Sequence, residues 1–464
     1  MKKIKNIFVF LCIIIFLLPA IFTNHKSGVR SEINNTNLPE LHGKEIFNRG
    51  KLNDYITERV GFHDKSIDFY LNFNDIFFKE LLHPSYSYGK DGYIFGIPNE
   101  SIVDKKFIDD FAIYLKNIQD YCKLRDVPFV YCINPSKESV YPHLLPNGYN
   151  RSNENISYLT YKLDELGVNY ISNIEYLRNI AKKEQIYNVK FDPGHWNDLG
   201  AMYGTNRVLS HMKKDYPDIQ TKSVSDFDSK KVHVTKLPVS NFKIDEWVPE
   251  FRNKETEKIQ NDTKDFEEIE LHPQHPAFNV HKMQAHTSLN LPKVLVFAGS
   301  YYNRNRDFYT SAFRESYSIH NYENLLNFEY YFNIFQPEYV ILFSAEHTIR
   351  PNYYNPTLLA NKKLNPPLEE VIKTSKYKYI KLPAKLYKDD KIDTEISNLG
   401  LKEFNIKRNK ALEKISFSND MNYKFGYIKK DDLILDLIVN DKSISCTTNI
   451  NNLTFDNAEI YLFK

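Results

Sequence analysis

The chain has 464 residues, which exceeds one compact domain and predicts about two or three domains. Its 42% hydrophobic and 26% charged residues are typical of a folded globular protein and exclude an intrinsically disordered one. The 61 Lys and Arg nearly balance the 59 Asp and Glu, and neither a Gly-x-Gly-x-x-Gly nor a Gly-x-x-x-x-Gly-Lys-Ser/Thr motif occurs, so nucleic-acid binding and the common nucleotide sites are not favoured.

The N-terminus joins positive charge to an apolar run. Lys2, Lys3 and Lys5 precede the apolar segment 7–22, an order typical of a signal peptide or a signal anchor. The run is short for a bilayer core, which takes about 20 residues, but the residues that follow offer no good Ala-x-Ala cleavage site. We therefore expect residues 1–24 to be an uncleaved anchor, or otherwise a signal peptide, and the protein to be membrane-anchored or secreted.

The next predicted elements are mainly helical. Apolar residues at three- and four-residue intervals predict a helix over 46–82 and an amphipathic helix over 102–122. Between them, in GKDGYIFG at 89–96, Asp91-Gly92 is a tight-turn signal flanked by short strand-like pieces.

A repeating α/β pattern follows. Helical periodicity at 155–166 and 173–183 alternates with short apolar runs. Four such runs are predicted to be strands: 127–133, 168–171, 293–300 and 338–344. Because these runs are apolar on both faces, the sequence predicts an α/β domain with a parallel sheet and helices on both of its faces.

Two segments depart from this pattern. Residues 214–290 form a charged, Pro- and Asp-containing stretch, which we interpret as an insertion in a domain covering 25–372. Residues 373–464 contain short β-rich stretches separated by Asn, Asp and Lys turns, which predict a small C-terminal all-β module. That module either holds carbohydrate or serves as a scaffold or interaction domain.

A serine follows one of the predicted strands. The run 293–300 ends in Ala298-Gly299-Ser300, and helical sequence resumes near Asp307. Functional groups gather at the carboxyl ends of parallel strands, where a serine can act as a nucleophile with backbone N–H groups facing the bound carbonyl oxygen. The alternative is a serine that caps the next helix.

A base for this serine is found in FDPGHWNDLGA at 191–201, where Asp192 stands three residues before His195. A histidine accepts a serine proton best when a carboxylate fixes its tautomer and stabilises the imidazolium. An aspartate cap beside a partly buried histidine is the structural alternative. Together with Ser300, the pair predicts a Ser-His-Asp triad.

This pattern resembles that of SGNH-type hydrolases, and more closely that of the alginate O-acetyltransferase-like SGNH proteins and their relatives named for an Asp-His-His-Trp (DHHW) motif. The resemblance rests on four motifs in the same order. His195-Trp196-Asn197 with Leu199-Gly200-Ala201 is similar to the His-Trp-x-x-x-Gly-Ala of that group. GKDGYIFG and NPSKESVYPHLLP (134–146) are similar to two further motifs, and the Asp/His motif precedes the serine, as in the group.

Two departures accompany the resemblance. The group has Gly-Asp-Ser where this chain has Ala298-Gly299-Ser300, so the aspartate beside the serine is missing. The close relatives carry Asp-x-His or Asp-His-His, whereas Asp192 and His195 have the longer spacing of ordinary SGNH enzymes.

The resemblance implies a three-layer, flavodoxin-like parallel sheet and an extracytoplasmic O-acetyltransferase or acetylesterase of a bacterial cell-surface or secreted polysaccharide. It implies an acetyl donor that is reached through a membrane-bound O-acyltransferase, and no metal or organic cofactor. A deacetylase would use the same residues. The alternative from another class is a weakly active or inactive protein that binds polysaccharide or assembles an export complex.

Further site residues are candidates only. Candidate oxyanion donors are the N–H of Ser300 and the side chains of Tyr301 and Asn303. The alternatives are that Tyr301 is a packed aromatic residue and that Asn303 caps a helix. Candidate substrate contacts are Lys137, Tyr141 and Trp196, of which the first two otherwise close the rim of the cleft.

Metal binding is the rival hypothesis for one histidine-rich loop. It contains His272, His275, His281 and His286, without a carboxylate or thiolate at a familiar spacing. The cysteines outside the apolar run form no CxxC pair, which argues against a zinc ribbon and a disulfide framework.

Overall fold

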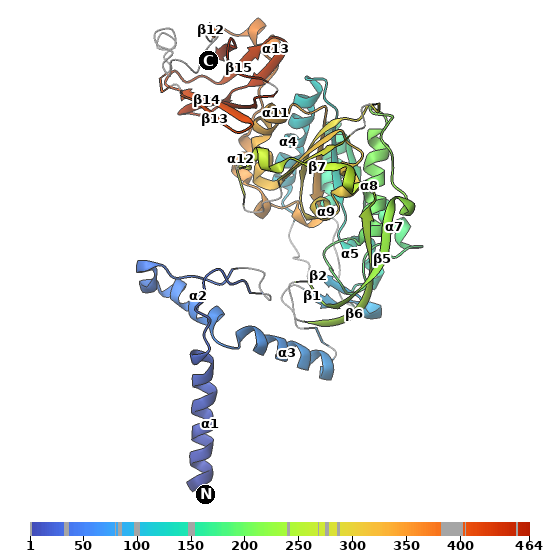
Figure 1. Cartoon of the computed structure of the whole chain (residues 1–464), viewed down its shortest axis with the longest axis vertical. Coiled ribbons are helices and arrows are strands. Elements are labelled where there is room, and N and C mark those ends of the chain that lie inside the picture. Colours follow the sequence, from blue (N-terminus) through green and yellow to red (C-terminus); the bar gives the residue numbers. More distant parts are fainter. Residues whose placement is uncertain are drawn as a thin grey trace.

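The computed structural model describes residues 2–31, 37–78, 80–81, 86–96, 103–146, 154–238, 242–267, 269–273, 278–284, 288–381, 402–403, 405–451 and 453–464. This part of the chain is mixed α/β, with a seven-stranded, mostly parallel sheet and smaller antiparallel sheets (Figure 1). The predicted α/β class is confirmed at this level.

The first three α-helices of the described part of the chain are α1 (Lys2–Ile21), α2 (Arg49–Arg59) and α3 (His63–Phe78). By length and composition, the window Ile4–Ile21 of α1 is apolar enough to cross a membrane. The prediction of one helix over 46–82 is wrong, because the chain breaks between α2 and α3. Phe62 there has a φ of 67°, and a Cβ on Gly61 would lie only 2.6 Å from the Cβ of Phe22, so this turn packs directly on the end of α1.

The predicted turn in GKDGYIFG forms a small hairpin. Its strands are β1 (Tyr86–Tyr88) and β2 (Ile94–Gly96), which pair antiparallel. Asp91 and Gly92 lie in the connection and have φ values of 53° and 75°, the left-handed region that Gly and Asp adopt most readily.

The central sheet has the order β4-β3-β11-β9-β10-β8-β7. Its parallel strands are β3 (Phe129–Asn134), β4 (Tyr170–Ser172), β9 (Lys293–Ala298), β10 (Glu315–His320) and β11 (Tyr339–Ala345). The four predicted strands are therefore present. Strand β10 was not predicted; its polar residues Ser316 and Ser318 alternate with Tyr317 and Ile319, and all four are buried.

Successive residues of the central strands enter two different apolar clusters, one on each face of the sheet. Leu295 and Phe297 of β9 pack with residues of α4 (Lys105–Lys123), α6 (Glu154–Leu166), α11 (Phe328–Phe335) and α12 (Pro356–Asn361). Val294 and Val296 pack with residues of α8 (Asp198–Met212), α9 (Ser300–Arg304) and α10 (Asp307–Thr310). Burial on both faces explains why these strands are apolar throughout.

Residues 214–290 contain regular structure that the sequence pattern did not indicate. A long antiparallel hairpin is formed by β5 (Phe227–Lys236) and β6 (Lys243–Asn253). Two further strands, β7 (Ile259–Asn261) and β8 (Asn279–Met283), add an antiparallel edge to the central sheet. The sheet is therefore mostly parallel, and not parallel throughout as predicted.

The C-terminal part contains two four-stranded antiparallel sheets, with orders β12-β19-β15-β16 and β13-β14-β18-β17. Their strands are β12 (Tyr377–Lys381), β13 (Asn405–Asn409), β14 (Leu412–Ser418), β15 (Phe425–Lys430), β16 (Leu433–Asp436), β17 (Ile438–Val439), β18 (Ser443–Asn449) and β19 (Glu459–Phe463). Their inward residues, such as Ile415, Ile428 and Ile460, form a separate apolar core. The remaining helices are α5 (Lys137–Val140), α7 (Ile174–Ala181) and α13 (Leu368–Thr374).

Candidate active site

Ser300 lies at the carboxyl end of a central strand of the sheet. Strand β9 ends at Ala298, Gly299 is extended, and Ser300 is the first residue of α9. The side chain is exposed. Because a helix leaves its first N–H groups without an intrahelical acceptor, the N–H of Ser300 is available to an oxygen bound beside the hydroxyl.

Ser300, His195 and Asp192 meet in space. His195 Nε2 lies 2.8 Å from Ser300 Oγ, and His195 Nδ1 lies 2.8 Å from Asp192 Oδ1. When Asp192 accepts the Nδ1–H, the Nε2 lone pair faces the serine hydroxyl, which is the tautomer that a general base needs. The structure thus brings the three predicted residues together in the predicted order of contacts.

Asp192 has a second partner that the sequence analysis missed. Arg304, one turn after Ser300 on α9, pairs through Nη1 with Asp192 Oδ2. Burial by itself raises the pKa of Asp192. The hydrogen bond and the charge of His195 lower it, as do the charges of Arg304 and Lys137, and together they hold the pKa below its ordinary value. Asp192 is therefore kept as an anion. The sequence signal for Arg304 is its four-residue spacing from Ser300, which puts the two side chains on one face of a helix.

The segment before Asp192 is held by a residue from the β5–β6 hairpin. The Glu246 carboxylate accepts the N–H groups of Val189, Lys190 and Phe191, at 2.6, 2.9 and 2.6 Å. Asp192 itself has a φ of 48°, a left-handed conformation that aspartate tolerates better than most residues. Glu246 thus fixes the approach to a turn that places Asp192 beside His195.

The same hairpin also reaches the serine side of the site. The Asp198 carboxylate, at the start of α8, accepts the N–H of Phe251 on β6 at 2.8 Å and the side-chain N–H of Asn305, just after α9, at 3.0 Å. One carboxylate therefore links the start of α8, strand β6 of the hairpin and the residue that follows α9. No sequence pattern pointed to Glu246 or Asp198, since their partners lie about 50 residues or more away.

The residues after His195 explain the spacing of the His-Trp-x-x-x-Gly-Ala motif. Asn197 caps α8 by accepting the Gly200 N–H at 3.0 Å. A Cβ on Gly200 would lie 2.3 Å from the Ile186 carbonyl oxygen, and one on Gly204 would lie 2.6 Å from the Trp196 ring. Trp196 is fully buried against α8, so its predicted contact with substrate is corrected to a packing role.

Tyr301 is not an oxyanion donor. Its side chain is buried, and its hydroxyl donates to the Gly194 carbonyl at 2.7 Å. Its ring centroid lies 5.0 Å from those of both His195 and Trp196, so the ring packs against the histidine. Asn303 is half-buried on α9 and donates its backbone N–H to Gly299; its role as a donor stays a prediction.

Lys137 and Tyr141 are likewise buried and not at the rim of a cleft. Lys137 Nζ donates to the carbonyls of Ile94 and Val189, at 2.7 and 2.9 Å, and burial lowers the pKa of Lys137 to about 7. The Tyr141 hydroxyl accepts the Ile186 N–H at 3.2 Å. Both residues brace the segment that leads to Asp192, which corrects their predicted contact with substrate.

The histidine-rich loop is only partly described. His272 pairs with Glu323 at 3.1 Å, and His281 is half-buried on β8, whereas His275 and His286 lie outside the described residues. Within the described ranges, no group of three or more His, Cys, Asp or Glu residues is arranged to hold a metal ion.

No family model and no curated protein matches the sequence. Solved structures that resemble the chain include three proteins. PatB1 of Bacillus cereus with a sulfonyl adduct is 14% identical, with a TM-score of 0.46 over 60% of this chain and 99% of its own. The O-acetyltransferase domain of Pseudomonas putida AlgJ is 12% identical, with a TM-score of 0.41 over 60% of this chain and 98% of its own.

The third is a DHHW family protein of Eubacterium siraeum, which is 16% identical, with a TM-score of 0.41 over 60% of this chain and 94% of its own. The AlgJ domain and the DHHW protein carry the names of the group that the sequence motifs resemble, so the predicted resemblance is confirmed. At these identities and TM-scores the likeness establishes no reaction.

Proposed function

We propose that the protein is an extracytoplasmic O-acetyltransferase or acetylesterase that acts on a cell-surface or secreted polysaccharide through Ser300, His195 and Asp192. The observation that carries the proposal is the chain of two 2.8 Å hydrogen bonds from Ser300 through His195 to Asp192. The exposure of Ser300 supports a polymeric acceptor, because a long glycan can reach a nucleophile that is not enclosed.

In the first half of the reaction, Ser300 Oγ attacks the acetyl carbonyl carbon while His195 Nε2 takes the hydroxyl proton. The charge that develops on the carbonyl oxygen is met by the N–H of Ser300. The leaving alcohol or thiol receives the proton from His195, and Ser300 keeps the acetyl group as an ester.

In the second half, a sugar hydroxyl or water attacks that ester, and His195 again takes and returns the proton. A sugar acceptor makes the protein a transferase, and water makes it an esterase. Asp192 remains ionised throughout and stabilises the imidazolium. These steps need the chain's own groups, an acetyl donor and an acceptor hydroxyl or water.

The surroundings of this chemistry are part of the proposal. Residues 1–24 anchor the protein, residues 25–372 form a three-layer, flavodoxin-like SGNH domain, and residues 373–464 form a β module that holds glycan or serves as a scaffold. By resemblance, the acetyl group arrives through a membrane-bound O-acyltransferase. The apolar helix α1 supports the anchoring.

Hydrolysis of p-nitrophenyl acetate tests the proposal. Ser300→Ala and His195→Ala are expected to lose the enzyme-dependent rate, and Asp192→Asn most of it. His233→Ala is a matched control, because His233 also pairs with an aspartate, Asp245, at 2.7 Å, but on the exposed hairpin. A wild-type rate equal to that of Ser300→Ala would favour the non-catalytic polysaccharide-binding protein instead.

A further inference from the structure

Helix α3 presents opposite faces to two different environments. At about 100° per residue, Phe69, Phe73, Ile76 and Phe77 form a stripe opposite Leu71. The four side chains of this aromatic stripe are 41% to 72% exposed, whereas Leu71 is 3% exposed. The Phe73 ring lies 6.3 Å from that of Phe69 and 4.6 Å from that of Phe77, so the stripe is a continuous apolar surface.

The face that carries Leu71 is bound to the body of the protein. Leu71 packs in a cluster with Ile94 of β2 and with Leu237, Phe242 and Ile244 at the tip of the β5–β6 hairpin. Asp75 accepts a hydrogen bond from the Tyr88 hydroxyl of β1 at 2.8 Å. The aromatic stripe therefore points away from these contacts.

The start of α3 is tied to the end of α1. Gly61 donates its N–H to the Pro19 carbonyl at 2.8 Å, Asn24 donates its N–H to the Arg59 carbonyl at 2.9 Å, and the Phe22 and Phe62 ring centroids lie 5.1 Å apart. Figure 1 shows α3 leading sideways from the end of α1 towards the β1–β2 hairpin.

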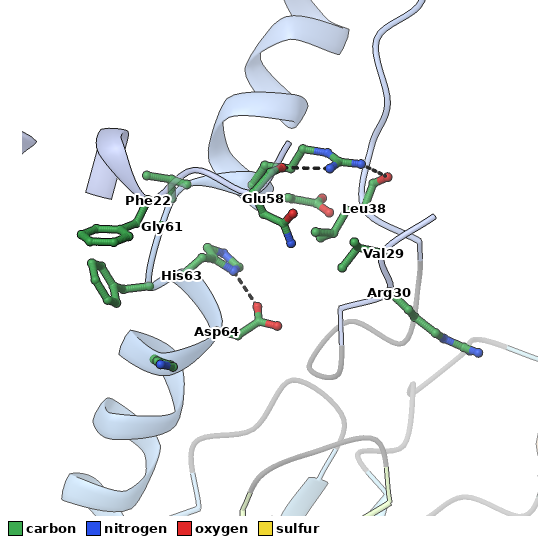
Figure 2. A pocket seen from close by; sticks show the side chains of 13 residues that line it. Phe22, Val29, Arg30, Leu38, Glu58, Gly61, His63 and Asp64 are labelled. Atoms are coloured by element: carbon green, nitrogen blue, oxygen red, sulfur yellow. Dashed lines mark hydrogen bonds and ion pairs between the residues drawn. The ribbon is translucent and has the colours of Figure 1, made fainter. Parts of the chain in front are cut away.

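A buried arginine fastens the same junction. The Arg59 guanidinium donates to the carbonyls of Asn24, Lys26, Leu38 and Pro39. Figure 2 shows the pocket beside it, of about 330 Å³, with Phe22, Leu38 and Gly61 on its walls and the His63–Asp64 pair at the first turn of α3. The end of α1 and the first turn of α3 therefore share one packed junction.

We infer that α3 is an interfacial helix whose aromatic stripe lies in the outer surface of the lipid bilayer that α1 spans. The inference goes beyond the proposed reaction and rests on the proposed anchoring by α1. A helix with one strongly apolar face, lying at the level where a membrane span ends, buries that face among the headgroups and upper acyl chains, and aromatic side chains favour this zone.

The charges of α3 agree with this orientation. Asp64, Asp68 and Asp75 lie within about 60° of Leu71 around the helix, on the side of the protein body, and the stripe carries no carboxylate. Lys65 lies beside the stripe, where its amine can reach lipid phosphates. Since the β1–β2 hairpin and the hairpin tip rest on the other face of α3, the helix sets the height of the catalytic body above the bilayer.

The test uses the full-length chain in lipid nanodiscs of phosphatidylglycerol and phosphatidylethanolamine. Cys122, Cys132 and Cys446 are buried, so Cys12→Ser removes the remaining native cysteine. In this background a fluorescent thiol probe is attached to Phe73→Cys. The control is Tyr161→Cys, at an exposed position of α6. We expect nitroxide lipids labelled near the headgroup to quench the probe at position 73 but not at 161, and aqueous iodide to quench the probe at 161 but not at 73.

A separate sample with the probe on native Cys12 and nitroxides deep in the acyl chains reports on the anchor. If Cys12 is quenched by lipid while position 73 is quenched by iodide like position 161, the inference is overturned and the anchor stands. That result would favour a protein partner as the binder of the aromatic stripe. If Cys12 is not quenched by lipid, the anchor and the inference both fail, whereas the reaction proposed for Ser300 is measured independently.

Discussion

Asp192 is held between His195 and Arg304, with one carboxylate oxygen on each partner. The arginine comes from the same short helix that begins with Ser300. The base, the carboxylate that orients it and the nucleophile are therefore connected in a closed loop of contacts, in which a change to Arg304 acts on the acidity of Asp192 without touching Ser300.

Replacement of Arg304 by Gln is expected to shift the pH profile. The positive charge helps to keep the pKa of Asp192 low against the effect of burial, so its loss raises that pKa, and Asp192 is protonated at higher pH than in the wild type. The acid limb of kcat/KM then moves to higher pH, and the rate falls by roughly tenfold, the worth of one charge-assisted hydrogen bond. Arg304→Lys is expected to restore part of the rate and part of the position of the acid limb. An unchanged pH profile in Arg304→Gln would contradict the effect of Arg304 on Asp192.

Replacement of Glu246 by Ala is expected to lower kcat much more than it changes KM. It removes the acceptor of three N–H groups just before Asp192, so the turn that positions Asp192 loosens while the surface near Ser300 stays. Unpaired N–H groups also reduce the free energy of unfolding, by about 1–3 kcal/mol. Glu250→Ala on the same strand is the matched control, since its pair with Lys230 is exposed. Equal kinetics of the two variants would show that Glu246 does not position the loop.

Much of this site could be predicted from sequence, and the failures have physical causes. Asp192, His195 and Ser300 stand in local patterns, a turn before a helix and the end of an apolar strand, which determine their chemistry within a few residues. Glu246 and Asp198 act on backbone groups far along the chain, and no local pattern announces an unpaired N–H in a distant segment. Arg304 could have been found from its four-residue spacing to Ser300.

In the fold, too, local sequence patterns were predictive, whereas contacts between distant segments were not. Strands β3, β9 and β11 are buried on both faces and were predicted from their apolar runs. Strand β10 was missed because Ser316 and Ser318 interrupt its apolar pattern while being buried. Lys137 was predicted to contact substrate, or otherwise to close the rim of the cleft. Lysine is usually solvated, and no local pattern indicates that two carbonyls from distant segments, Ile94 and Val189, hold its amine inside.

The titration of Lys137 is expected to appear in the stability of the protein. Burial lowers the pKa of this amine from 10.5 to about 7, and the neutral amine still has two N–H groups for its two carbonyl acceptors. Between about pH 7 and the ordinary lysine pKa of about 10.4, the unfolded chain binds the proton that the folded chain has lost, so this group makes the free energy of unfolding rise with pH.

Urea unfolding at a series of pH values across that window measures this contribution. Lys137→Met is expected to be less stable than the wild type above the folded pKa, because both carbonyls lose their donor, and to lack the rise. A wild-type curve and a Lys137→Met curve that run parallel would contradict the assignment.

The contact between the catalytic body and the C-terminal sheets is expected to depend on Asp436. Its buried carboxylate accepts hydrogen bonds from the Tyr121 hydroxyl and from Arg125 Nη2, the latter at 3.0 and 3.2 Å. Asp436→Ala leaves the partly buried guanidinium without its anion, which costs up to about 3–5 kcal/mol. Thermal unfolding should begin at a lower temperature, with the hydrolysis rate at room temperature retained, whereas the exposed Asp432→Ala should change neither. An unaltered Tm in Asp436→Ala would contradict the role of this contact.

The central claim, that Ser300 carries the acetyl group, is tested most directly by trapping the acyl-enzyme. The full-length protein is mixed with p-nitrophenyl acetate, quenched in acid within the first turnover, digested and analysed by mass spectrometry. An acetyl group is expected on the hydroxyl of Ser300 in the wild type, and none at this position in Ser300→Ala. Turnover in the wild type without acetylation of Ser300, or turnover of the same rate in Ser300→Ala, would contradict that claim.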